Sequence, residues 1–167
     1  MYNIGEYISY GNNGVCEIVG TEIMDSSMGS VNSRQCYILR PLHDRSCKIT
    51  TPVDNQKVIM RKLISKEETR QLLDDIPEIE TLPEQSARQQ EIAYQKALHS
   101  CDCREWISLI KTLNERILAR KMKGKKVTAT DDRYYKAASD KLIEEFSVVL
   151  GIDKGKTKEL LSNAFGQ

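Results

Sequence analysis

The chain has 167 residues, of which 40% are hydrophobic and 29% charged, and its formal net charge is +1. This composition is ordinary for a globular protein and allows one domain or two small ones. Every apolar run is too short to cross a membrane, and the N-terminus lacks the basic region and apolar core of a signal peptide. The five cysteines follow no disulfide-framework spacing, so we expect reduced thiols in a cytoplasmic protein.

The first sixty-odd residues predict short strands. Ile4–Tyr10 alternates in the way that suits a pleated surface, and Gly11–Gly14 supplies a tight turn before a second strand at Val15–Ile18. The segment Asp25–Ser33 is predicted to be a longer hairpin tip. Strands spaced in this way predict a small antiparallel sheet curled into a barrel. Three further strands are expected at Gln35–Leu39, Cys47–Thr51 and Val58–Leu63.

The pattern changes at Ser65, where Ser65 and Glu68 fit a capping box that starts a short helix running to about Leu73. Ile76–Leu82 holds a proline and shows no clear period, so we expect a linker there. The segment Thr81–Glu84 fits a second capping box, with a proline in the first turn.

The remainder predicts helices. One helix is expected at Ala87–His99, and Gly151 and Asp153 should end one helix and start the last, which runs through Leu161. Two stripes at helical spacing predict buried faces: Trp106, Ile110, Leu113 and Ile117, then Tyr135, Ala138, Leu142, Phe146 and Val149. The predicted fold is therefore α+β, with a β-domain at 1–65, a short helix and linker at 66–82, and an all-α bundle at 83–167.

The N-terminal half contains a set of residues in a distinctive order: Gly5, Tyr10, Gly14, Val15, Tyr37, Leu39, Pro52, Val53, Asn55 and Arg61. This pattern resembles the CarD/CdnL family of bacterial transcription regulators, whose β-module also occurs in transcription-repair coupling factor. The resemblance implies a Tudor-like β-domain that binds the β1 lobe of the RNA polymerase β subunit. It also implies a helical domain that contacts promoter DNA at the upstream edge of the melting bubble and stabilises the open complex, without catalysis.

The resemblance also suggests where each partner would bind. Polymerase contacts are expected at Met24, Lys48, Ile49, Thr50, Thr51 and Pro52. Some family members have basic residues at two of these positions, where this chain has Met24 and Thr50 instead. Docking is therefore expected to use backbone pairing at a sheet edge and apolar contact. In studied members a tryptophan wedges against the minor groove at the bubble edge. The corresponding position here is near Ala87, where there is no aromatic residue. The sole tryptophan, Trp106, belongs to an apolar stripe and is expected in the core.

Positive charge concentrates in the second half, since residues 83–167 carry a net charge of +4 and residues 1–82 a net charge of −3. Phosphates bind such cations without demanding sequence, whereas a solvated helix end favoured by the macrodipole is the plainer interpretation. Arg88, on the helix expected to face the bubble, is a further candidate for the minor groove. The DNA-contacting candidates are Arg88, Lys111, Arg116, Arg120, Lys121, Lys123, Lys125, Lys126, Arg133 and Lys136.

Other chemistries find little support in the residues. Cys101 and Cys103 form a C-x-C pair, but His43 and His99 are poorly spaced to complete a zinc site, so we expect two partly buried thiols and no metal. No catalytic triad, P-loop or dinucleotide fingerprint is present, so we expect no enzyme and no cofactor. We expect the protein to be a monomer. Two functional hypotheses stay open: a regulator bridging polymerase and promoter DNA, or a polymerase-binding adaptor without DNA contact.

Overall fold

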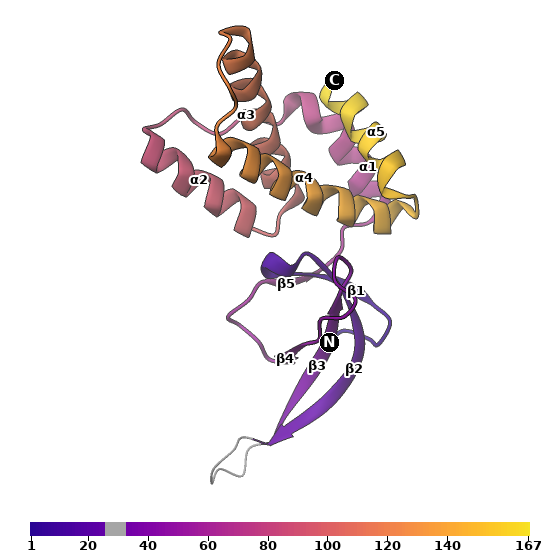
Figure 1. Ribbon diagram of the computed structural model, residues 1–167. Coiled ribbons are helices and arrows are strands. Elements are labelled where there is room, and N and C mark those ends of the chain that lie inside the picture. Colours follow the sequence, from indigo (N-terminus) through magenta and orange to yellow (C-terminus); the bar gives the residue numbers. More distant parts are fainter. Residues whose placement is uncertain (26–32) are drawn as a thin grey trace. The chain divides into compact units, whose positions relative to one another are not determined.

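The computed structural model describes residues 1–25 and 33–167, and the chain divides into two compact units, Met1–Leu63 and Ile64–Gln167. The first unit is a five-stranded antiparallel sheet and the second is built from five α-helices (Figure 1). The fold is therefore α+β. Among the described residues, no helix is long and apolar enough to cross a membrane.

The sheet of the first unit has the strand order β4-β3-β2-β1-β5. Its strands are β1 (Tyr7–Tyr10), β2 (Val15–Asp25), β3 (Ser33–Pro41), β4 (Ile49–Pro52) and β5 (Met60–Lys62). The expected barrel is wrong for the described residues: β4 and β5 lie at opposite edges and do not pair with each other. A closed barrel needs a hydrogen-bonded ladder between its first and last strands, and no such ladder joins β4 to β5 in the described residues.

The β1–β2 connection shows why glycine is needed there. The turn is a 3-10 segment at Gly11–Asn13, and Gly14 leaves it with φ +67° and ψ −141°, a conformation open essentially to glycine alone. Ile4 precedes β1 and is exposed, so the strand is shorter than the alternation suggested. The predicted hairpin tip begins and ends at Asp25 and Ser33, which pair with each other, and the residues between them lie outside the described part.

The core of the first unit consists of one face of the sheet. The side chains that bury there are Ile8, Tyr10, Cys16, Ile18, Tyr37 and Leu39. Tyr2 closes over this face: its backbone N–H donates to the Tyr37 hydroxyl at 2.9 Å and its own hydroxyl donates to the Met60 carbonyl at 3.1 Å.

The helical unit begins with α1 (Lys66–Asp75), followed by a 3-10 turn η2 (Ile76–Glu78) and α2 (Ala87–His99). Ser65 and Glu68 form the predicted capping box in full. The predicted box at Thr81–Glu84 is wrong, because no helix starts there: α2 begins at Ala87, with Ser86 at its N-cap position. Ile76 and Ile79 are buried in the core of this unit, so the segment expected as a linker is packed into it.

Three longer elements complete the unit: α3 (Cys103–Met122), α4 (Ala129–Leu150) and α5 (Lys154–Phe165). Asp102, Thr128 and Asp153 cap their N-termini with side-chain oxygens, and Gly151 ends α4 at φ +66°. The core confirms Trp106, Leu113 and Phe146 as buried. On α4 the register differs slightly from the predicted stripe: Tyr134 is fully buried, whereas Tyr135 is only partly buried.

Candidate functional site

The first candidate site is the outer edge of β4, which pairs only with β3 among the strands that the structure describes. Val53 N–H donates to the Gln35 carbonyl at 3.0 Å, so alternate residues of β4 direct their backbone groups toward β3. Thr51 is one of these, and the N–H and C=O of Thr50 therefore face away from the sheet. Pro52 has no N–H, and its carbonyl accepts a hydrogen bond from Asn55 N–H at 3.0 Å, so the open part of the edge ends there.

Side chains on the face opposite the core hold this edge in place. The Glu22 carboxylate accepts a hydrogen bond from the Thr50 hydroxyl at 3.1 Å and pairs with the Lys48 ammonium at 3.3 Å. Met24 lies two residues further along β2, on the same face by strand alternation, and is half exposed. The edge therefore presents an open backbone bordered by one apolar and several polar side chains.

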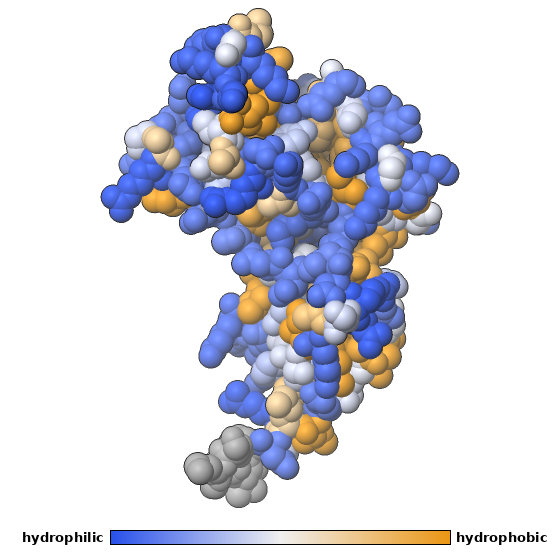
Figure 2. Space-filling view, viewed as in Figure 1, coloured by the Kyte–Doolittle hydropathy of each residue, from blue (hydrophilic) through white to orange (hydrophobic). Residues whose placement is uncertain are grey.

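The second candidate site is a cationic surface on the helical unit. Figure 1 shows the C-terminal turns of α3 extending past the other helices, and Figure 2 shows mostly hydrophilic residues over this end. Arg116 lies on α3 with its Nε 3.4 Å from the buried carboxylate of Asp131, and Arg120 Nε donates to the Lys126 carbonyl at 2.8 Å. We call α3 from Arg116 onward, together with the following loop through Lys126, the α3–α4 tip.

The remaining cations divide by what they contact. Arg133 pairs with Glu91 at 3.2 Å and stacks over the Tyr134 ring at 5.1 Å, and Lys136 pairs with Asp132 at 2.8 Å. The hydrogen bond to Asp132 raises the pKa of Lys136. Five further candidates are exposed and form no ion pair with any described residue: Arg88, Lys121, Lys123, Lys125 and Lys126. These lysines make the tip the region of the helical unit best able to attract an anion.

Comparison with known families assigns the first unit. The family model described as the CarD-like/TRCF RID domain matches residues 2–64, which is the sheet and its short N-terminal extension. The first unit belongs to the CarD-like/TRCF RID family. This domain is an RNA polymerase-interacting domain, and the assignment supports a role in transcription regulation. The match ends where the helical unit begins, and a search of curated proteins found no match.

The predicted polymerase-contacting residues of the RID unit divide between the two faces of the sheet. Thr50 and Pro52 lie on the face opposite the core and beside the open edge, whereas Thr51 is buried and Ile49 packs against the core. Sequence reasoning missed Glu22, which joins Lys48 to Thr50. Its position depends on the register between β2, β3 and β4, and no local motif around Glu22 reveals that register.

Lys111 is placed differently from the other predicted DNA contacts. Its ammonium donates to the carbonyls of Ile76 at 2.8 Å, Pro77 at 3.1 Å and Ile79 at 2.6 Å. An ammonium has three N–H donors, so none remains for a phosphate. We therefore remove Lys111 from the DNA-contacting set and assign it to the packing of η2 against α3.

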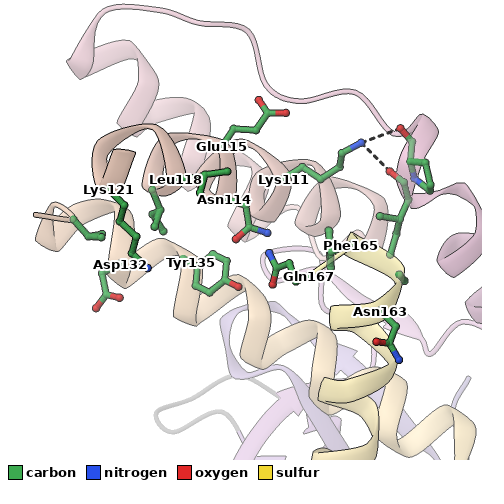
Figure 3. A pocket seen from close by; sticks show the side chains of 16 residues that line it. Lys111, Asn114, Glu115, Leu118, Lys121, Asp132, Tyr135, Asn163, Phe165 and Gln167 are labelled. Atoms are coloured by element: carbon green, nitrogen blue, oxygen red, sulfur yellow. Dashed lines mark hydrogen bonds between the residues drawn. The ribbon is translucent and has the colours of Figure 1, made fainter. Parts of the chain in front are cut away.

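A cavity of about 790 Å³ lies beside Lys111, between η2, α3, α4 and the end of α5. Figure 3 shows Asn114, Tyr135 and Gln167 around it, with Leu118 and Phe165 contributing apolar surface. Its charged lining is of both signs, since Lys121 is accompanied by Glu115 and Asp132. These groups do not converge on one point with one charge, so the cavity has no clear chemical preference.

The cysteine pair and the tryptophan lie in the interior. Cys101 and Cys103 are buried on either side of Asp102, and neither forms a disulfide. Within residues 1–25 and 33–167, no group of three or more His, Cys, Asp and Glu side chains is arranged to hold a metal ion. Trp106 is 1% exposed and its indole N–H donates to the Leu98 carbonyl at 3.1 Å, so it joins α3 to α2 in the core.

Proposed function

We propose that this protein is a transcription regulator that binds the β1 lobe of the RNA polymerase β subunit through its RID unit. In this proposal its helical unit contacts promoter DNA near the upstream edge of the bubble and so modulates the stability of the open complex. The family match of residues 2–64 is the observation that carries the polymerase part. The exposed lysines of the α3–α4 tip support the DNA part, because their positive charge is complementary to the negative charge of a phosphate backbone.

The β4 edge is the proposed docking site for polymerase. An extended segment of the partner would pair with the outward N–H and C=O of Thr50, adding a strand to the sheet. Lys48, Pro52 and Met24 would border that strand, while Ile49 and Thr51 would hold β4 on the core. Main-chain pairing of this kind needs no cation at Met24 or Thr50.

Thr50→Pro in the full chain tests this docking mode. Proline removes the outward N–H and leaves the groups that face β3 untouched, so the sheet should remain folded. Thr50→Val is the matched control, because it keeps the N–H and removes only the hydroxyl bonded to Glu22. We expect the proline variant to lose binding to the isolated polymerase β1 lobe and the valine variant to retain most of it. Equal binding by wild type and proline variant would exclude the β4 edge, and a wild-type chain that does not bind the lobe would remove the polymerase proposal.

The DNA part of the proposal concerns Lys121, Lys123, Lys125 and Lys126, with Arg116 and Arg120 beside them on α3. Arg88, Arg133 and Lys136 would contribute more weakly, the last two because they already pair with carboxylates. We expect phosphate contacts with little sequence preference, made by a monomer. Transcription in vitro with and without the protein, combined with a footprint of the upstream bubble edge, tests the effect on the open complex.

A second function is favoured by the pairing of Lys111, Arg133 and Lys136 within the helical unit. These contacts reduce the free positive charge, so a polymerase-binding adaptor without DNA contact is the alternative. Measuring DNA affinity against salt separates the two functions, because phosphate contacts produce a steep decrease of affinity with salt and an adaptor would show none.

A further inference from the structure

Two arginines of the α3–α4 tip are held in the same way. Arg116 directs its Nε to Asp131 at 3.4 Å, and Arg120 directs its Nε to the Lys126 carbonyl at 2.8 Å. In each side chain the protein engages the inner nitrogen of the guanidinium group. Among the described residues, the terminal nitrogens of the two groups form no hydrogen bond.

The anchors differ in chemistry but both are fixed. The Asp131 side chain is 3% exposed, so its carboxylate is part of the packed interior, and the side chain of Arg116 above it is 43% exposed. The Lys126 carbonyl belongs to the loop that returns from α3 to α4, and Lys125 N–H donates in turn to the Arg120 carbonyl at 2.9 Å. Each guanidinium group is therefore tied through its Nε, and neither side chain is fully buried.

The helix sets the spacing of the two backbone positions that carry these side chains. Residues four apart lie on the same face of an α-helix, separated by about 6 Å along its axis. Two outward forks at this spacing match two neighbouring phosphates on one nucleic-acid strand. The neighbouring lysines differ, because an ammonium on a flexible stem attracts a phosphate without fixing its direction.

We infer that Arg116 and Arg120 form a paired phosphate site, oriented by Asp131 and the Lys126 carbonyl, that grips two successive phosphates of one DNA strand. This inference rests on the proposed DNA contact of the helical unit and names the residues that give it geometry. Each fork makes two parallel N–H···O bonds to a phosphate, which a lysine cannot do. Because the side chains are held before binding, less rotamer freedom is lost when the phosphates arrive.

Variants that conserve charge separate this site from a general cationic surface. The full chain carrying both Arg116→Lys and Arg120→Lys keeps its net charge but loses both forks. The matched control carries Lys123→Arg and Lys125→Arg, which adds forks at positions with no anchoring contact. Binding to a fluorescein-labelled DNA duplex of random sequence is followed by anisotropy over a salt series.

We expect the double lysine variant to bind about tenfold more weakly at every salt concentration, with the slope of log K against log salt unchanged. The control should bind as the wild type does. Equal affinity of the lysine variant and wild type would overturn the paired site while leaving DNA binding intact. A wild-type chain with no salt-dependent affinity would instead overturn the proposed DNA contact, and the paired site with it.

Folding is checked in the same samples through Trp106, the sole tryptophan, which is buried in the helical core. If the double variant unfolds, Arg120→Lys alone serves the test, since Arg120 has no buried carboxylate as partner. It should lose about half of the effect on a logarithmic scale. An Arg120→Lys variant that is folded and binds with wild-type affinity would contradict the inference.

Discussion

Replacing Lys111 by Met tests whether this residue serves the fold or a phosphate. The substitution keeps an unbranched apolar stem of similar length and removes the ammonium that three carbonyls share. It should destabilise the helical unit and leave DNA affinity nearly unchanged, the opposite of what its position in a basic segment suggests.

The magnitude follows from the three acceptors. A hydrogen bond to a charged group contributes about 1.5–3 kcal/mol, and a buried acceptor left without a partner costs about 1–3 kcal/mol. Pro77 is exposed, so water can replace the lysine there, whereas Ile76 and Ile79 are buried. Counting only the unpaired carbonyls of the two buried residues, at about 1–3 kcal/mol each, gives a loss of roughly 2–6 kcal/mol in the free energy of unfolding.

Urea unfolding monitored by Trp106 fluorescence measures this loss, because the single tryptophan is 1% exposed in the core of the same unit. Lys121→Met is the matched control: it lies on the same helix, is exposed and forms no ion pair with the described residues. We expect a lower midpoint for Lys111→Met and nearly the wild-type midpoint for Lys121→Met. Only the Lys121 variant should reduce the salt slope of DNA binding, by about 0.9. Equal midpoints for the two variants would refute the assignment of Lys111 to packing.

Three further outcomes are expected. Gly14→Ala should cost the RID unit about 1–3 kcal/mol, since its φ of +67° is strained for any side chain, and urea unfolding of this unit followed by circular dichroism should show it. Ser65→Ala should lower the stability of the helical unit by about 1 kcal/mol by removing the capping box, whereas the exposed control Lys66→Ala should have little effect. Burial raises the pKa of Tyr94, so the folded chain keeps this proton while the unfolded chain releases it, and stability should fall as the pH rises past about 10. Tyr94→Phe should reduce that loss, and an unaltered alkaline unfolding curve would contradict this origin.

Local chemistry made much of the fold predictable. The capping box at Ser65, the helix Ala87–His99, the helix end at Gly151 and the burial of Trp106 were all expected and are present. Each depends on residues within a few positions of one another, so the sequence contains the whole signal. The prediction of a linker at Ile76–Leu82 was wrong because the burial of this segment is not a local property. It depends on contacts with α3, thirty residues further along the chain.

The functional surfaces were predictable in kind but not in detail. By itself the sequence determined the residues of the RID motif and the charge bias of the second half, since both are properties of composition and order. Only the tertiary structure decided that β4 is an open edge of the described sheet, that the Lys111 ammonium donates its hydrogen bonds to backbone carbonyls, and that Arg116 pairs with Asp131. These facts depend on strand register and helix packing, which bring together groups distant along the chain and leave no local pattern.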